Sequence, residues 1–249
     1  MPRPPIRIEA HRLTKRFGTV EAVTDLTFTA APGTVTGFLG PNGAGKTTTL
    51  RMLLGLVRPT SGTATIGGLR YAELPDPPGT VGALLDSAHL HPARTGRDHL
   101  RVYGAMAGCD GRRIEELIAM LDLGPFVDRP ARGYSTGMRR RVGLATALLP
   151  DPPVLVLDEP GNGLDPRGIA WLRTLLRSLA AEGRTVLVSS HVLGETQQLV
   201  DDVVIIDSGR LVAQGPVAEL TRDGTDLEQL FLHATGGHTT GGHRERGHI

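Results

Sequence analysis

The sequence predicts an α/β protein with a mostly parallel central sheet. Strand-like apolar runs alternate with helical patterns over residues 154–207, and such alternation is typical of parallel strands joined by helices. The run VLVL at 154–157 contains no polar residue, as expected of a strand that is covered on both faces. A glycine-rich loop at 40–48 joins a strand-like run to a helical pattern, which fits the same class.

The first part of the chain alternates apolar and polar residues, which favours short strands. Pro59 stops the helical pattern that follows the glycine-rich loop. The elements expected in order are strands within 6–30, a strand at 34–40, a helix at 46–56, a strand at 62–68, a proline-rich loop at 71–80 and a strand at 81–86.

Few strand signals occur between about residues 87 and 150, where 96–123 has the pattern of two helices. We expect a helical subdomain there. The later elements expected are a strand at 154–157, a helix at 166–181, a strand at 185–190, a helix at 193–200, a strand at 202–207, a short strand at 209–215 and a helix at 226–234. Residues 1–234 are thus predicted to form one domain. The Gly/Thr/His-rich segment 235–249 is predicted to be a disordered tail.

The composition is that of an ordinary globular protein, and its nearly neutral net charge does not favour a strongly charged partner. Hydrophobic residues make up 39% of the 249 residues, and the formal net charge is +1, so charge alone does not suggest nucleic acid as a partner. Cys109 is the only cysteine, which excludes an internal disulfide. Because no apolar run is long enough to span a bilayer and the start lacks a secretory signal, we expect a cytoplasmic location.

The stretch GPNGAGKTT at 40–48 matches the phosphate-binding pattern G-x-x-x-x-G-K-[ST]. Backbone N–H groups of such a loop wrap around phosphate oxygens at the start of a helix. Lys46 is expected to reach the β- and γ-phosphates, Thr47 to hold Mg²⁺, and Thr48 to contact the α-phosphate. The other predicted nucleotide-binding residues of the loop are Gly40, Pro41, Asn42, Gly43, Ala44 and Gly45.

Two adjacent carboxylates follow the apolar run at 154–157. Asp158 emerges at the end of the expected strand, where a carboxylate supports Mg²⁺ beside a phosphate loop. Taken alone, Asp158 could instead cap a helix. Glu159 points elsewhere and can take a proton from an attacking water.

Taken together, these motifs resemble the nucleotide-binding subunit of ABC transporters over about residues 6–234. YSTGMRRR at 134–141 occupies the place of the family's signature, usually written LSGGQ. The remaining matches are Asp165 in the D-loop GNGLDP, His191 at the switch position after VSS, Phe17 in KRFG where an aromatic stacks on adenine, and Asp86 in VGALLD where most members carry the Q-loop glutamine.

The resemblance implies a P-loop NTPase fold with an N-terminal antiparallel β subdomain and a helical subdomain. It also implies ATP and Mg²⁺ as cofactors, with Thr47, Asp86 and Asp158 at the metal and Lys46, Glu159 and His191 in catalysis. In the family, two domains pair head to tail. Ser135 and Gly137 would then contact the γ-phosphate bound by Lys46 of the other subunit, with Asp165 also at the nucleotide.

This sequence departs from the family pattern at several positions. Tyr134, Thr136 and Met138 replace Leu, Gly and Gln of the signature, and Thr136 lacks the conformational freedom of glycine. Asp86 is shorter than glutamine and charged. A glutamate at this position resembles the bacitracin-type and multidrug-exporter branch. Aspartate departs further from the usual glutamine than that glutamate does.

Several residues also have structural interpretations. His191 could be a capping or core histidine, and Phe17 a core aromatic. Arg139, Arg140 and Arg141 add positive field near the signature, or they form a solvated face. The histidines His233, His238, His243 and His248 could bind a metal or belong to a flexible tail.

The leading functional hypothesis is the ATPase subunit of a membrane exporter of a drug or other small amphipathic molecule. It would work as a homodimer or heterodimer with a membrane-spanning permease on a separate chain, at the inner face of the cell membrane. The alternative is a soluble ABC-type ATPase acting on nucleic acid or ribosomes. That class usually carries two such domains or a long coiled-coil insert, and this chain has one P-loop and a short insert.

Overall fold

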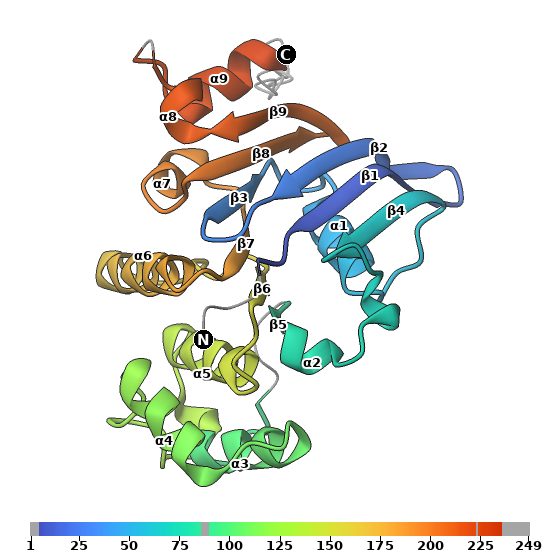
Figure 1. Cartoon of the computed structure of the whole chain (residues 1–249). Helices are drawn as coiled ribbons and strands as arrows, with labels where there is room; N and C mark the ends of the chain where they lie inside the picture. Colours follow the sequence, from blue (N-terminus) through green and yellow to red (C-terminus); the bar gives the residue numbers. More distant parts are fainter. Residues whose placement is uncertain (1–4, 86–89, 223, 236–249) are drawn as a thin grey trace, which may run out of the picture.

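Six strands form the central sheet of the computed structural model, which describes residues 5–85, 90–222 and 224–235. Their order is β5-β6-β7-β3-β8-β9 (Figure 1). The neighbours from β5 to β8 pair in parallel, and β9 is antiparallel to β8. The bounds are β3 Val35–Leu39, β5 Val81–Leu84, β6 Val154–Leu157, β7 Thr185–Ser190, β8 Asp202–Asp207 and β9 Arg210–Pro216. The predicted α/β class with a mostly parallel sheet is confirmed.

A second, antiparallel sheet contains the three strands β2-β1-β4. These strands are β1 Ile8–Phe17, β2 Val20–Ala30 and β4 Ser61–Ile66. The helix α1, Lys46–Leu53, lies between this sheet and the central one (Figure 1). The antiparallel N-terminal sheet inferred from the resemblance is therefore present.

Alternate residues of the central strands feed two separate cores. On β6, Val154 and Val156 pack with α1 and the antiparallel sheet, whereas Leu155 and Leu157 pack with helices on the opposite face. This alternation follows from the two-residue period of a strand. Because both faces are covered, the strands are apolar throughout, as the VLVL run predicts.

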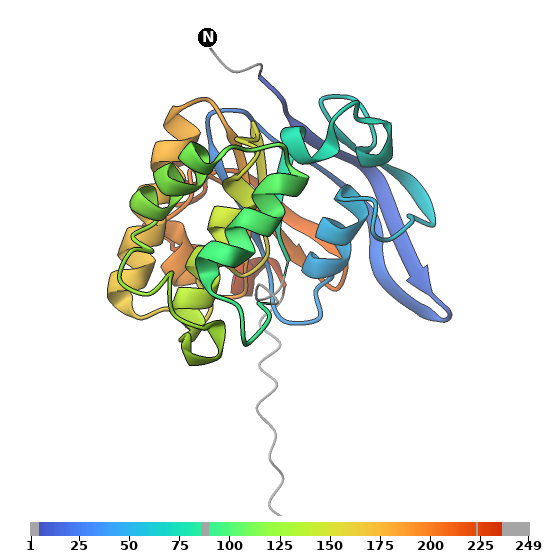
Figure 2. The ribbon, with the colours of Figure 1, turned by 90° about the horizontal axis from the view of Figure 1, so that it is seen from below.

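Three helices follow β5 in the described part of the chain before β6 begins: α3 Gly96–Met106, α4 Gly111–Met120 and α5 Thr136–Leu148. Figures 1 and 2 show them grouped on one side of the molecule. Thr95, Asp110 and Ser135 cap their first turns by accepting backbone N–H bonds. Their buried side chains belong to the same core as Leu155 and Leu157, so these helices are packed onto the sheet by one continuous core.

Some predicted boundaries were wrong for local reasons. The helix expected to reach residue 56 ends at Leu53, because Gly55 takes a left-handed φ of 68°, which ends helices. Pro59 therefore lies beyond the helix and does not stop it. The proline-rich segment is not a simple loop: it contains the 3₁₀ turn η1 Tyr71–Glu73 and the short helix α2 Pro77–Thr80, where Asp76 accepts from Gly79 N. A second 3₁₀ turn, η2 Ala131–Gly133, precedes α5.

The last third of the chain follows the predicted order closely. The helix α6 is Pro166–Ala181 as predicted, and α7 is the shorter segment Leu193–Gln197. The short helix α8 Val217–Leu220 and the helix α9 Leu227–Ala234 complete it. His233 lies in the last turn of α9, and Thr235, the first residue of the predicted tail 235–249, is its C-cap. Residues 236–249 of that tail lie outside the described residues. None of the helices in the described ranges is both long and apolar enough to cross a bilayer.

A buried histidine connects α3 to α5. His99 is 7% exposed, and its Nε2 lies 3.2 Å from Thr146 Oγ1. The Thr146 hydroxyl donates to Val142 O at 2.9 Å, so it accepts from the histidine and assigns the proton to Nε2. Burial lowers the pKa of His99 below its ordinary value of 6.5, and the positive charge of Arg94 lowers it further.

The lowered pKa of His99 predicts a loss of stability at acid pH. The neutral form is favoured in the folded state, so stability is fully present above pH 6.5 and falls as the pH drops through the folded-state value. Urea unfolding at a series of pH values should show this fall in the wild type. His99→Gln keeps an amide donor toward Thr146 without titrating, and its free energy of unfolding should fall less over that range. Equal pH dependence in both proteins would contradict the assignment.

Candidate functional site

The predicted site residues follow three neighbouring strands of the central sheet. The strands β6, β7 and β3 lie side by side and run parallel. Leu39, the last residue of β3, is opposite Ser190, the last of β7. Leu157, the last of β6, is opposite Val188. Because parallel strands place their carboxyl ends at one edge, the glycine-rich loop, the two carboxylates and His191 meet there.

Close contacts with two other strands dictate the glycines of the loop. A Cβ on Gly45 would lie 2.4 Å from Ala22 O of β2, and one on Gly40 would lie 2.3 Å from Ile206 O of β8. Gly45 also has a φ of 98° as the N-cap of α1, a conformation that side chains disfavour. The loop therefore rests on both sheets, with the N-terminus of α1 at its end.

Lys46 is a nearly buried cation, at 6% exposure. Its Nζ donates to Gly40 O at 2.7 Å and Pro41 O at 3.2 Å, and lies 3.5 Å from Glu159 Oε1. A buried ammonium is costly without counter-charge. The Glu159 carboxylate at 3.5 Å and the two carbonyl oxygens supply part of this counter-charge. The remainder could come from bound anionic oxygens, which suits a phosphate site.

Asp158, which follows β6, connects helix α1 and strand β7 through its two carboxylate oxygens. At 3% exposure, it accepts from Thr47 Oγ1 at 2.8 Å and from Ser189 Oγ. No helix begins directly after it, so the interpretation as a helix cap is wrong.

Thr47 and Asp158 provide the hard oxygen ligands that Mg²⁺ prefers. Among the described residues, no group of three or more His, Cys, Asp or Glu side chains could hold a metal. A Mg²⁺ ion here would thus take most of its ligands from phosphate and water, as it does where one or two protein oxygens bind it. The residues present fit that ion with a bound nucleotide. Asp86, the third predicted ligand, lies outside the described residues.

Glu159 lies between the lysine and the histidine. Its carboxylate is 3.5 Å from Lys46 Nζ through Oε1 and 2.8 Å from His191 Nδ1 through Oε2. The side chain of His191 is 35% exposed, so the interpretation as a core histidine is wrong. The three residues predicted to act in catalysis are therefore brought together in one chain.

Ser189 is a site residue that the sequence reasoning missed. Its hydroxyl donates to Asp158 and accepts from the backbone N–H of Glu159 at 2.9 Å. Glu159 has a φ of 49°, which is uncommon for a residue other than glycine, so Ser189 supports a strained carboxylate position. The pair of serines that ends the apolar strand before His191 was the available signal.

The signature segment packs on the D-loop of its own chain. A Cβ on Gly137 would lie 3.3 Å from Leu164 Cδ2, and one on Gly163 would lie 3.1 Å from Thr136 Cγ2. Ser135 caps α5 through a bond from Met138 N at 3.2 Å. Asp165 caps α6 through a bond from Gly168 N at 2.7 Å. Within the described residues, neither Ser135 nor Asp165 bonds to the glycine-rich loop of the same chain.

The structure accounts for the three unusual signature residues. Tyr134 is 6% exposed, and its hydroxyl accepts from Gly96 N at 2.9 Å and lies 3.0 Å from Phe126 O. It therefore ties the signature to α3 while filling the place of leucine. Thr136 is the first residue of α5 and has no positive φ, so glycine is not required there. The sulfur of Met138 faces Ser135 N at 3.5 Å and closes the cap.

The arginines after the signature are mainly structural. Arg140 is 7% exposed, and Arg139 donates to Ala131 O at 2.8 Å. Arg141 bonds to Asp122 at 3.1 Å and stacks 4.3 Å from the ring centre of Trp171. The interpretation as a solvated charged face is therefore wrong for this set. These contacts anchor α5 to its neighbours.

The remaining predicted binding residues lie on the loop and at the end of β1. Asn42 and Gly43 are exposed, Pro41 and Thr48 are half-buried, and Ala44 is buried. Phe17 is 51% exposed, with Lys15 Nζ 4.8 Å from its ring centre. The interpretation of Phe17 as a core aromatic is therefore wrong, because about half of its side chain is exposed.

The strand–glycine loop–helix unit, with Lys46, Thr47 and Asp158 at one sheet edge, defines a P-loop nucleoside triphosphatase. The chain belongs to the ABC transporter family, whose model matches residues 23–162. It is similar to the bacitracin transport ATP-binding protein BcrA of Bacillus licheniformis, with 39% identity over 86% of this chain and 71% of that protein.

Two further comparisons agree with this family. The Nod factor export ATP-binding protein I of Ralstonia nicotianae (strain ATCC BAA-1114 / GMI1000) is 41% identical over 84% of this chain and 66% of its own length. A solved structure described as the ATP-binding subunit of an ABC transporter superposes with a TM-score of 0.82 at 28% identity. That match covers 92% of this chain and 99% of the other. The chain is thus of the ATP-binding type, as the bacitracin-type resemblance predicts.

The two bonds of Ser189 predict a measurable role for it. Ser189→Ala leaves a buried carboxylate oxygen of Asp158 without its donor and frees Glu159 N. The kcat for ATP should fall roughly ten- to a hundred-fold, as when a group that orients a metal ligand is removed. Ser178→Ala, at an exposed position of α6, is the matched control. An unchanged kcat in Ser189→Ala would show that the hydroxyl does not support the site.

Proposed function

We propose that the chain binds and hydrolyses ATP with Mg²⁺ and powers a membrane transporter that exports a drug or other small amphipathic molecule. The single observation that carries the hydrolytic part is the line of contacts Lys46–Glu159–His191 beside the Thr47–Asp158 pair. It combines a cation for phosphate, a carboxylate for water and a metal position within one sheet edge.

Each of these side chains has a definite task in hydrolysis. Lys46 neutralises phosphate oxygens as charge develops in the transition state. Glu159 takes or orients the proton of the attacking water, and His191, at 2.8 Å, fixes the direction of that carboxylate. Mg²⁺, when bound, polarises the phosphates and orients them. Asp86 is proposed to contact the metal or its water. The nucleotide is held by Phe17 and by the loop residues Gly40, Pro41, Asn42, Gly43, Ala44, Gly45 and Thr48.

The transport part rests on the named relatives, which are a bacitracin transport ATP-binding protein and a Nod factor export ATP-binding protein. The membrane partner is a permease on a separate chain, which would hold this subunit at the inner face of the membrane. The neighbouring reading frame should then encode about six apolar stretches of ~20 residues, and its product should co-purify with this chain. A neighbour without such stretches, together with binding to ribosomes, would favour the soluble ABC ATPase instead.

A head-to-tail dimer completes the proposed site. Ser135 and Gly137 lie at the start of α5, whose N-terminus suits an anion. Ser135 bonds to Met138 of the same helix and Gly137 lies beside Leu164 of the D-loop, so the described contacts of the pair do not reach their own Lys46. The γ-phosphate they serve would then be the one bound by the other subunit. Asp165, which caps α6, lies in the same D-loop.

Glu159→Gln tests the catalytic carboxylate. The amide keeps the shape of the side chain but cannot accept a proton, so turnover should fall roughly 10²–10⁴-fold while ATP still binds. ATP should then accumulate a stable dimer, measured by size-exclusion chromatography. Glu228→Gln, on the exposed side of α9, is the matched control. Normal turnover in Glu159→Gln would move the base elsewhere, with His191 as the next candidate.

Mixing two inactive variants tests the shared site. Lys46→Ala removes the phosphate cation, and Gly137→Asp places a negative charge at the signature. The new side chain would meet Leu164 Cδ2 at 3.3 Å, a contact that the flexible leucine can relieve. Random pairing leaves one intact site in each mixed dimer, so an equal mixture should regain about a quarter of the wild-type sites. If every combination stays inactive while Gly137→Asp still forms the ATP-dependent dimer, the two-subunit site is wrong.

A further inference from the structure

The position of His191 depends on the short segment that follows it, which is held to α9 by a bond from Leu227 N to Gln197 Oε1 at 3.2 Å. The described side-chain bond of His191 is to Glu159, so the backbone must aim the ring. On one side, β7 lies inside the central sheet. On the other, α7 contains only five residues, and a helix of one turn is not stable without tertiary support.

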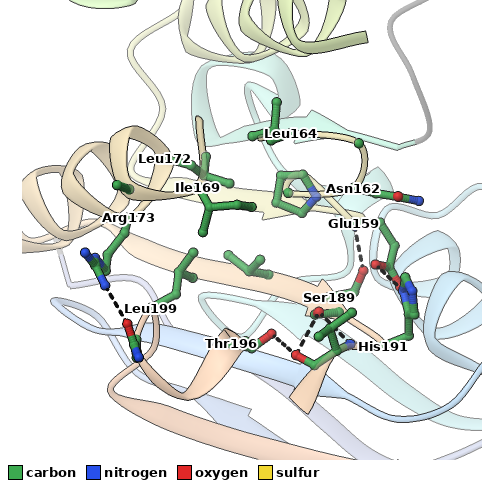
Figure 3. Close-up of a pocket in the computed structure, with 18 of the residues that line it drawn as sticks. Glu159, Asn162, Leu164, Ile169, Leu172, Arg173, Ser189, His191, Thr196 and Leu199 are labelled. Atoms are coloured by element: carbon green, nitrogen blue, oxygen red, sulfur yellow. Dashed lines mark hydrogen bonds and ion pairs between the residues drawn. The ribbon is translucent and has the colours of Figure 1, made fainter. Parts of the chain in front are cut away.

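A pocket of about 500 Å³ lies between α6 and this segment. Figure 3 shows Ile169, Leu172 and Arg173 of α6 on its wall, with His191 and Thr196 also lining it. An open space has no atoms to supply packing contacts. Apolar packing therefore does not fix α7 along the side that faces α6.

Polar contacts from α6 bridge this gap at Gln198, the C-cap of α7. Arg173 Nη1 donates to Gln198 Oε1 at 2.9 Å, and this bond is the dashed line that starts at Arg173 in Figure 3. Arg177 Nη2 donates to Gln198 O at 3.0 Å. The two arginines are four residues apart and thus on one face of α6. Together they hold both the side chain and the main chain of Gln198.

Hydrogen bonds carry this restraint back to His191. Leu199 N donates to Thr196 O at 2.8 Å, next to Gln198. Thr196 Oγ1 donates to Val192 O at 2.6 Å, and Val192 N donates to Ser190 Oγ at 3.1 Å. His191 lies between Ser190 and Val192, so a shift of Gln198 is passed along α7 to the histidine.

We propose that Gln198, held by Arg173 and Arg177, is a positioning residue that sets the orientation of His191 toward Glu159. This inference rests on the proposed ATPase function. It links α6, the helix that follows the D-loop, to the histidine of the same chain through Gln198 and α7.

Variants of Gln198 in the full chain test this role through turnover. Gln198→Ala removes the acceptor for Arg173 and should lower kcat about ten-fold with the KM for ATP within two-fold, since a small misplacement costs mainly the chemical step. Gln198→Glu keeps an acceptor and adds charge complementarity, so it should retain most turnover. Gln214→Ala is the matched control, because Gln214 lies on the edge strand β9 and its amide bonds to Thr29 O of β2. Wild-type kcat in Gln198→Ala would overturn the proposal.

The NMR signal of His191 gives a readout that does not depend on hydrolysis. In histidine-labelled protein, assigned with His191→Gln, the His191 ring signal should move in Gln198→Ala and stay close to wild type in Gln198→Glu. The signal of buried His99 should not change. A His191 signal unmoved in Gln198→Ala would overturn the positioning role, whereas an inactive wild type would instead refute the proposed function.

A second variant serves if Gln198→Ala does not fold. Arg173→Lys keeps the charge and loses the planar fork, so it should give the same shift of the His191 signal. The absence of that shift would overturn the positioning role.

Discussion

A buried carboxylate at the end of β6 organises the site. Asp158 accepts from Thr47 and from Ser189, so one side chain joins the helix after β3 to the strand β7. Ser189 in turn receives the backbone N–H of Glu159. Because a buried carboxylate requires donors, the positions of the glycine-rich loop, the acidic pair and the switch segment are mutually fixed. The geometry around Lys46 and His191 depends on this anchor.

The sheet makes such an anchor possible. Three adjacent parallel strands deliver their carboxyl ends to one edge, and two apolar cores hold those strands from opposite faces. The glycine-rich loop can approach the edge only because Gly40 and Gly45 have no side chain where Ile206 O and Ala22 O pass. Rigid strands thus carry a site built from Ser189 of β7, from the loops that follow the strands and from the first residues of α1.

The signature segment is tied to the rest of the chain partly by residues that differ from the common family pattern. Tyr134 replaces an apolar residue yet stays buried, since its hydroxyl satisfies Gly96 N. Arg141 reaches Trp171 of α6 and Asp122 beyond α4. The turn at Ser135 therefore keeps its capped geometry despite three substitutions. The D-loop beside it leads into α6, which also holds Gln198.

The sequence by itself determined the α/β class, the glycine-rich loop with Lys46 and Thr47, and the acidic pair, because these depend on local spacing and strand–helix alternation. Helix ends were less predictable: Gly55 ended α1 early through its left-handed backbone, and Asp76 turned a proline-rich loop into α2. Only the tertiary structure decided that Ser189 supports Asp158, that Phe17 is exposed, and that Arg139–Arg141 anchor α5. Those outcomes depend on which distant segments lie within bonding distance, and no local pattern encodes that distance.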